Sequence, residues 1–247
     1  MSLFATTKPC FPAATLASAG LNRYAILALD SLPADIVDSL QGITGDLSNF
    51  RQLILIGHGG RALWEGVQAA NIRSADPIDD YTVKTIAHCF AAELPETAYQ
   101  LIYPSQHPIG LQRLGELAGW HHASPFMVGI DSEWGSWSAY RAVLLTNSDF
   151  PLSGKVDRKH PCPTCIEKMC ISHCPAQALN SGQLELQRCL NFRLQPDSPC
   201  QHSCLARVAC PVGKQHAYSE AQMCHVYGTS LQWIRQQSYP LAPRVVS

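Results

Sequence analysis

The stretch that decides the fold is PCPTCIEKMCISHCPAQAL at residues 161–179, followed by PCQHSCLARVACPVGKQ at residues 199–215. The two stretches form an imperfect internal repeat and, with Cys189 between them, hold eight cysteines. Short spacings let successive backbone turns present thiolates to one metal centre, and the proline after the last cysteine of each stretch suits the first turn of a helix. The sequence therefore predicts a metal-binding module built from two similar halves.

Iron–sulfur cubes are the metal centres that this spacing favours. The cysteines resemble the ferredoxin-type pattern for two 4Fe-4S clusters, in which the cysteine before proline reaches across to the other cluster. The usual run is C-x2-C-x2-C-x3-C-P, whereas four residues separate Cys165 from Cys170 here, so the extra residues are expected to bulge outward. The resemblance implies one ligand set of Cys162, Cys165, Cys170 and Cys210 and another of Cys174, Cys189, Cys200 and Cys204.

Two alternatives to a pair of clusters stay open. Paired thiolates at short spacing also form tetrahedral zinc sites, for which His160, His173 or His202 could be a further ligand. Alternatively, one half of the module holds a cluster and the other half is degenerate. Cys224 lies beside His225 and is either a substitute ligand or a free thiol.

Composition and charge limit the classes to which the chain can belong. Of its 247 residues 46% are hydrophobic, which is enough for a buried core and unlike a disordered chain. Residues 1–154 carry 8 Lys and Arg against 14 Asp and Glu, whereas residues 155–247 carry 10 against 5. The basic part is the cysteine-rich part, where cations would partly neutralise negatively charged clusters. Because the cations are scattered, nucleic acid is not an expected partner.

The first residues lack the features of a secretory signal. In residues 1–20 the only cation is Lys8, and prolines interrupt the apolar run. No stretch approaches the roughly 20 apolar residues of a membrane span, so no membrane partner is expected. We expect a protein of the reducing cytoplasm, where clustered thiols bind metal and do not form disulfides. Cys10 and Cys89, outside the module, are expected in the core.

The first 150 residues alternate between helical and strand patterns, which predicts an α/β layer fold. Residues 147–161 combine Asn, Asp, Pro, Ser, Gly and Lys, as a linker does, so the predicted domains are 1–152 and 153–247. Helices are expected at 11–20, from about 33, at 62–70, from 77 and at 108–118, and strands at 24–29, 52–56, 99–103, 126–130 and 138–146.

Two polar stretches in this half fit ordinary local structure. GHGGR at residues 57–61 follows a strand and could hold a phosphate with its backbone N–H groups, but it also fits a plain tight turn. Asp76, Asp79 and Asp80 fit the start of a helix, because the helix dipole favours negative charge there.

The segment from 108 to 146 carries a second resemblance. PIGLQRLGELAGW at 108–120, GSW at 135–137 and RAVLLT at 141–146 precede the cysteine module in the order found in epoxyqueuosine reductases and reductive dehalogenases. The stretch ADPID at 75–79 is also similar to the cobalamin-processing chaperone of animals. The resemblance implies a nitroreductase-like α/β domain that binds cobalamin with its lower base detached. A ferredoxin-like module would follow, whose clusters reduce the cobalt.

The same resemblance implies candidate site residues. Epoxyqueuosine reductases carry an aspartate general acid in a VDTGPVLE stretch, and Ser105 occupies that position here, so their specific activity is not expected. Tyr103 lies close by and could supply a proton. The small residues of the Gly135-Ser136 turn would let the backbone approach a flat ring. The cofactor contacts implied are His107, Trp120, His121, Gly135, Ser136 and Trp137.

Taken together, the sequence predicts an iron–sulfur oxidoreductase that binds cobalamin and reduces it, acting on cobalamin itself or on a small substrate. Its expected partners are cobalamin or another corrinoid and an acidic electron donor such as flavodoxin or ferredoxin, which the basic module would attract. A non-catalytic electron-transfer or corrinoid-trafficking protein and a flavin-dependent reductase on the same fold are the alternatives.

Overall fold

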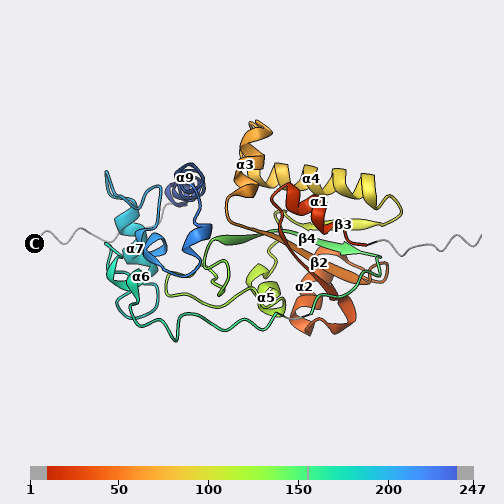
Figure 1. Cartoon of the computed structure of the whole chain (residues 1–247), viewed down its shortest axis with the longest axis horizontal. Coiled ribbons are helices and arrows are strands. Elements are labelled where there is room, and N and C mark those ends of the chain that lie inside the picture. Colours follow the sequence, from red (N-terminus) through yellow and green to blue (C-terminus); the bar gives the residue numbers. More distant parts are fainter. Residues whose placement is uncertain (1–9, 155, 238–247) are drawn as a thin grey trace, which may run out of the picture. The chain divides into compact units, whose positions relative to one another are not determined.

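The computed structural model describes residues 10–154 and 156–237, which fall into two compact units (Figure 1). The first unit comprises the residues up to Gly119 together with Ala139–Val156, and the second comprises Trp120–Ser138 together with the residues from Asp157 onward. The structure thus groups Trp120–Ser138 with the cysteine-rich residues. The domain ranges 1–152 and 153–247 stay predictions.

The first unit is built on a four-stranded sheet of order β1-β2-β4-β3. β1 pairs antiparallel with β2, and β3 pairs antiparallel with β4. All eight residues of β2 are buried, because this strand has neighbours on both edges and helices cover both of its faces (Figure 1). The strands are β1 (Arg23–Ala28), β2 (Gln52–Gly59), β3 (Tyr99–Tyr103) and β4 (Ser138–Thr146).

Helices α3 and α4 lie on one face of this sheet, and α2 lies on the other (Figure 1). Pro77 opens α4, and the buried side chains of that helix recur at spacings of three and four, from Ile78 to Phe90. Gly20 ends the turn after α1 with a φ of +86°, and a Cβ there would lie 2.3 Å from the backbone nitrogen of Leu63. The helices of this unit are α1 (Ala13–Ser18), α2 (Ala34–Thr44), α3 (Ala62–Ala69), α4 (Pro77–Glu93) and α5 (Leu111–Leu117).

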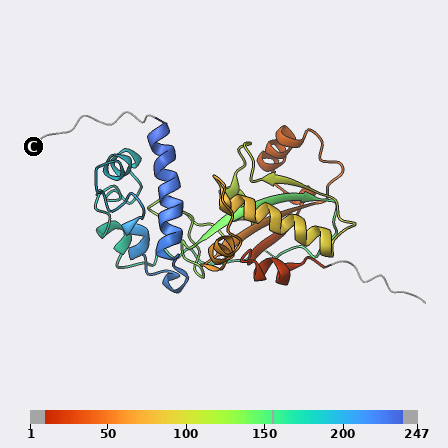
Figure 2. The same cartoon turned by 90° about the horizontal axis from the view of Figure 1, so that it is seen from above.

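The second unit is a set of loops and short helices beside one long helix, α9 (Figure 2). Helices α6 and α8 pack against each other. Ser219 caps α9 by accepting a hydrogen bond from the Gln222 nitrogen at 3.2 Å, and Leu231 and Ile234 are buried on that helix. The helices are α6 (Met169–Ser172), α7 (Leu186–Arg193), α8 (Leu205–Ala209) and α9 (Glu220–Gln236), and residues 238–247 lie outside the described part.

Most expected elements of the first half are confirmed, with their ends shifted by a few residues. The strand expected at residues 126–130 is wrong. Met127 has a φ of +62°, and the segment makes one isolated bridge, between Ile130 and His122. Phe126 and Ile130 are instead buried against Cys170 and Cys210 in the core of the second unit. A short apolar run fits a strand or a core loop equally well, and here the cysteine loops supply its partner.

The cysteines outside the module behave differently from each other. Cys89 is buried, as expected, whereas Cys10 is exposed, so its predicted core position is wrong. The structure contains free thiols at all eleven cysteines. Within residues 10–154 and 156–237, no helix is long and apolar enough to cross a membrane.

Candidate functional site

Two cavities in the second unit are each lined by four cysteines. A cavity of about 620 Å³ is lined by Cys162, Cys165, Cys170 and Cys210, which we call the first cysteine group. A cavity of about 340 Å³ is lined by Cys174, Cys189, Cys200 and Cys204, the second cysteine group. The grouping is the one that the ferredoxin-type crossing pattern implies, and the role of these thiols as cluster ligands stays a prediction.

Short helices produce this crossing. Cys170 lies within α6 and belongs to the first group, whereas Cys174 follows that helix and belongs to the second. Cys204 precedes α8 and Cys210 follows it, and they belong to the second and first groups respectively. Because α6 and α8 pack against each other, each helix places one thiol in each cavity.

The long spacing between Cys165 and Cys170 is accommodated by an exposed loop. Ile166 is 96% exposed, and Lys168 adopts a left-handed backbone conformation with a φ of +42° immediately before α6. A left-handed residue reverses the chain locally, so the extra residues point outward while both cysteines line the same cavity.

Burial raises the pKa of five of the eight thiols, and neighbouring thiolates raise it further. The pKa of Cys162 is raised to about 11, first by burial and then by the other three thiolates of its group. The pKa of Cys189 is also raised to about 11 by burial and by the thiolates of its group, although the nearby Arg193 charge acts in the opposite direction. A positively charged metal core inside each group would remove both penalties, because it binds the thiolate form.

Each cavity is lined by four thiols. Within the described part of the chain, no three His, Cys, Asp or Glu side chains are grouped so that they could hold one metal ion. A 4Fe-4S cube offers a separate iron to each thiolate, so its four ligands surround a space and need not converge on one point. Both cysteine groups surround such a space.

Two histidines considered as zinc ligands have backbone contacts instead. The Nε2 atom of His160 lies 2.9 Å from the Ala123 carbonyl oxygen, and the His160 ring stacks on that of His122 at 4.9 Å. The Nδ1 atom of His173 lies 3.0 Å from the Met169 carbonyl oxygen.

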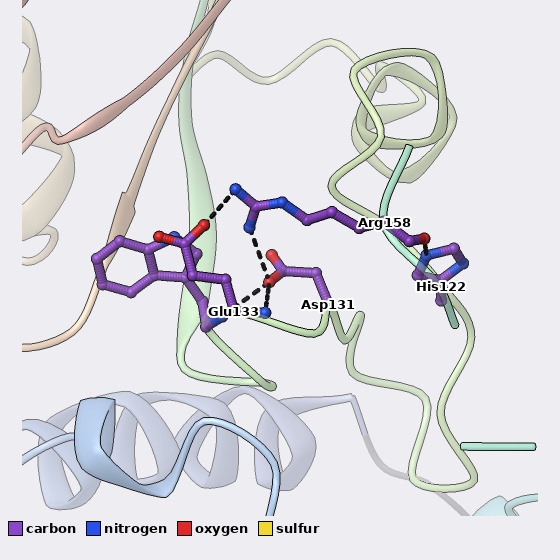
Figure 3. Close-up of polar contacts among 5 residues, drawn as sticks. His122, Asp131, Glu133 and Arg158 are labelled. Carbon is purple, nitrogen blue, oxygen red and sulfur yellow. Dashed lines mark hydrogen bonds and ion pairs between the residues drawn. The ribbon is translucent and has the colours of Figure 1, made fainter. Parts of the chain in front are cut away.

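A buried carboxylate holds the loop from Trp120 to Ser138 in shape (Figure 3). The fully buried Asp131 accepts hydrogen bonds through Oδ1 from the backbone nitrogens of Glu133 at 2.9 Å and Trp134 at 2.8 Å. Arg158 pairs with the same oxygen at 3.3 Å and also with the Glu133 carboxylate. The backbone carbonyl oxygen of Arg158 lies 2.7 Å from Nε2 of His122. The loop is therefore tied to the segment that leads into the cysteine module.

Loss of this carboxylate should destabilise the second unit. We expect Asp131→Ala to lower its free energy of unfolding by about 2 kcal/mol, because two backbone donors and one guanidinium lose a buried acceptor. Glu133→Ala is the matched control: it removes a half-exposed partner of the same arginine and should cost less than about 1 kcal/mol. Urea unfolding measures both values, and equal losses in the two variants would contradict the role given to Asp131.

The predicted cofactor contacts around Gly135 lie in the interior of the second unit. Gly135 has a φ of +59°, and a Cβ there would lie 2.0 Å from the Val212 carbonyl oxygen. Ser136 and Trp137 are buried, and the Ser136 hydroxyl accepts a hydrogen bond from Nε of Arg207 at 3.3 Å. Gly135 thus packs against the backbone of Val212, two residues after the last cysteine of the first group, whereas Ser136 and Trp137 contact Arg207.

The other predicted contacts lie in different surroundings. Trp120 is buried, and His121 is half-buried, close enough to Gly129 that a Cβ there would lie 2.5 Å from the His121 ring. His107 lies in an exposed loop of the first unit, where its backbone nitrogen donates to the Ser105 hydroxyl at 3.2 Å. The structure therefore brings Gly135, Ser136 and Trp137 together in the second unit, whereas His107 belongs to the first.

Tyr103 belongs to a polar cluster at one end of the sheet. Burial raises the pKa of its hydroxyl, the Asp79 carboxylate raises it further, and Arg141 opposes them. Arg141 donates through Nε to Nδ1 of the buried His58 at 3.0 Å, and its Nη1 lies 3.9 Å from Oδ1 of Asp79. The sequence patterns indicate only a helix start for Asp79 and a turn for His58. The feature of the sequence that could have revealed this cluster is Arg141, a cation on a strand immediately before the apolar run AVLL.

Two buried arginines of the cysteine-rich unit were also missed. Arg193 lies four residues after Cys189, and Arg207 lies midway between Cys204 and Cys210. At such helical spacings a cation lies near the cysteine that precedes it, which is the signal that could have revealed them.

The chain resembles solved structures of two groups of enzymes. An epoxyqueuosine reductase bound to a tRNA-Tyr stem loop matches with a TM-score of 0.53 and 15% identity, over 86% of this chain and 67% of that one. A catabolic reductive dehalogenase in complex with 3-bromo-4-hydroxybenzoic acid matches with a TM-score of 0.50 and 11% identity, over 91% of this chain and 34% of that one. A B12-trafficking protein CblC from C. elegans gives a TM-score of 0.42 at 14% identity, over 90% of this chain and 92% of that one.

No protein-family model matches the sequence, and no curated protein matches it. The chain spans about two thirds of the epoxyqueuosine reductase and about one third of the dehalogenase. The structural matches confirm the resemblance expected from the sequence, and at these identities the two enzyme matches show a shared fold.

Proposed function

We propose that the chain is an iron–sulfur oxidoreductase that binds cobalamin and whose second unit holds two 4Fe-4S clusters. The observation that carries this proposal is the gathering of eight cysteines into two groups of four around two cavities. Burial and neighbouring thiolates raise the pKa of Cys162 and of Cys189, and a multivalent cation would stabilise their thiolate forms. A bound 4Fe-4S cluster supplies one-electron transfer at low potential.

The residues around each group have separate tasks. The cysteine thiolates hold the cluster, and Phe126, Ile130 and Leu179 pack against the cavity walls and exclude water from them. A drier, apolar surrounding disfavours added negative charge, which favours a low reduction potential. Such a potential is what the reduction of a corrinoid cobalt requires.

Cobalamin is the proposed ligand because of the fold shared with epoxyqueuosine reductase and a reductive dehalogenase, together with the sequence motifs of those families. Of the contacts that the resemblance implies, His107 belongs to the first unit, and Trp120, His121, Gly135, Ser136 and Trp137 belong to the second. Flavodoxin or ferredoxin is the proposed electron donor, because the cysteine-rich residues 155–247 carry a positive balance of charge.

Tyr103 is the proposed proton donor, with Ser105 two residues after it in the first unit. Its raised pKa keeps the hydroxyl protonated well above neutral pH, so it can donate a proton across the physiological range. We expect Tyr103→Phe to slow turnover that needs a proton by about a hundredfold and to leave the affinity for cobalamin unchanged. Turnover and hydroxocobalamin binding measured on the same preparation check this, and full turnover of the variant would remove Tyr103 as the acid.

Anaerobic reconstitution of the full chain with iron and sulfide tests the whole proposal. We expect visible iron–sulfur absorption and about eight iron atoms per chain. Titration with hydroxocobalamin should then shift the cobalamin band as the lower ligand is lost, and titration with FMN should give no binding. A colourless reconstituted protein would contradict the clusters, and binding of FMN in place of cobalamin would support a flavin-dependent reductase. Turnover without an added substrate would identify cobalamin itself as the substrate.

A further inference from the structure

Two arginines are buried against the second cysteine group. Arg193, at the end of α7, is 8% exposed and donates to the Cys200 carbonyl at 3.0 Å, the Tyr227 carbonyl at 3.0 Å and the Ser230 hydroxyl at 3.2 Å. Its guanidinium also lies 5.4 Å from the centroid of the Tyr227 ring. Every one of these partners is neutral, so the positive charge of Arg193 is held in place without being cancelled.

Arg207, in α8, is 4% exposed and is held in a similar way. Its guanidinium lies 4.6 Å from the ring centroid of Trp137 and 4.9 Å from that of Tyr218. It donates to the hydroxyl and the carbonyl of Ser136 and to the hydroxyl of Tyr227. Aromatic faces and neutral acceptors stabilise a buried guanidinium only in part, so a counter-charge is still required.

The negative groups near these arginines are cysteine thiolates. Across residues 10–154 and 156–237, no acidic side chain forms an ion pair with Arg193 or Arg207. Arg193 lines the cavity of the second group, and Arg207 hydrogen-bonds to the Tyr227 side chain, which lines the same cavity. Both arginines therefore lie beside the second group.

The first cysteine group has no comparable pair of buried cations in the part of the chain described. The basic side chains that line its cavity are those of Lys168, which is exposed, and His160, which is partly exposed. Water and salt screen an exposed charge, whereas a guanidinium in a low-dielectric interior acts at nearly full strength. The two groups thus differ in the electrostatic field that acts on whatever they hold.

We propose that Arg193 and Arg207 are the counter-charge of the cluster held by the second cysteine group, and that they make this cluster easier to reduce than the one held by the first. This inference rests on the proposed function. Reduction takes one electron from a low-potential donor, dithionite in the test, and raises the negative charge of the cluster with its four thiolates by one, with no proton transferred. Buried cations stabilise the more negative state more strongly, so the second cluster is the one that retains an electron.

A redox titration followed by electron paramagnetic resonance tests this on the anaerobically reconstituted full chain. We expect two separate reduction potentials in the wild-type protein, the higher one belonging to the second group. A Cys162→Ser variant keeps only the second group complete. The resonance signal that remains in this variant is therefore assigned to the second cluster. Arg193→Gln and Arg207→Gln should each shift the reduction equilibrium of the second cluster at least tenfold toward the oxidised form, which is about 59 mV for a one-electron couple.

Two further variants separate charge from packing. Arg207→Lys keeps the positive charge and should restore most of the potential that Arg207→Gln loses. Lys168→Gln removes an exposed cation beside the first cavity. It should change the reduction equilibrium constant of either cluster by less than about threefold. Equal potentials in the wild type, or a higher potential for the first cluster, would overturn the inference even where the Gln variants fail to fold. A chain that takes up no iron would contradict the proposed function as well, whereas clusters with unchanged potentials in the Gln variants would contradict the arginine role alone.

Discussion

Cys189→Ser is expected to lower the iron content of the reconstituted protein from about eight to about four atoms per chain. Cys189 lies in α7 and lines the smaller cavity with the three other members of the second group. A serine hydroxyl remains protonated and binds iron poorly, so one wall of this cavity would lose its ligand. The first group contains none of the altered atoms and should keep its cluster. Iron and sulfide assays, with the visible absorption, measure the loss.

Cys224→Ser is the control for this experiment. Cys224 is an exposed thiol in α9, and it lines neither cavity. Its removal should leave the iron content unchanged, which would also dismiss its role as a substitute ligand. An unchanged iron content in Cys189→Ser would contradict the second ligand set. A colourless protein that contains zinc in place of iron would support the zinc alternative.

Gly135→Ala is expected to lower the stability of the second unit by about 4 kcal/mol. Its φ of +59° is costly for any residue with a side chain, and a Cβ would lie 2.0 Å from a backbone oxygen that cannot rotate away. The Val212 backbone would have to move, and with it the chain beside Cys210. Urea unfolding followed by tryptophan fluorescence suits the measurement, because Trp120, Trp134, Trp137 and Trp233 lie in this unit.

Gly182→Ala separates the two causes of that loss. Gly182 has a φ of +82° in the same unit, but a Cβ there would meet no atom within 4 Å. Its substitution should cost about 1 kcal/mol, which is the backbone contribution alone. If both alanine variants lost the same small amount, close packing against Val212 would not be what requires glycine at position 135.

The sequence predicted the elements of the first unit well because their patterns are local. The LILI run of β2 and the Asp76-Pro77 start of α4 each determine their own structure without help from distant residues. The division of the cysteines into two sets was an implication of the ferredoxin-type resemblance, and the same two sets line the two cavities. That these groups hold clusters stays a prediction.

Features that depend on distant partners were not predictable. Phe126 reads as part of a strand, and only the cysteine loops some 40 residues later in the sequence explain why it lies in a core loop. Arg207 reads as an ordinary surface cation until Trp137, about 70 residues earlier, is placed against it. The cluster around Arg141 likewise joins residues from β2, β4 and α4. Such contacts arise from tertiary packing, about which local spacing says nothing.

Because residues Trp120–Ser138 belong to the cysteine-rich unit, neither unit is formed by one continuous stretch of the sequence. The chain passes between the units three times, and a fragment beginning at residue 153 would leave behind Phe126 and Ile130, which pack against two cysteines of the first group. It would also leave behind the Ser136 and Trp137 contacts of Arg207. The cysteine-rich unit therefore cannot be produced as a continuous fragment of the chain, because it requires a loop that lies between two segments of the first unit.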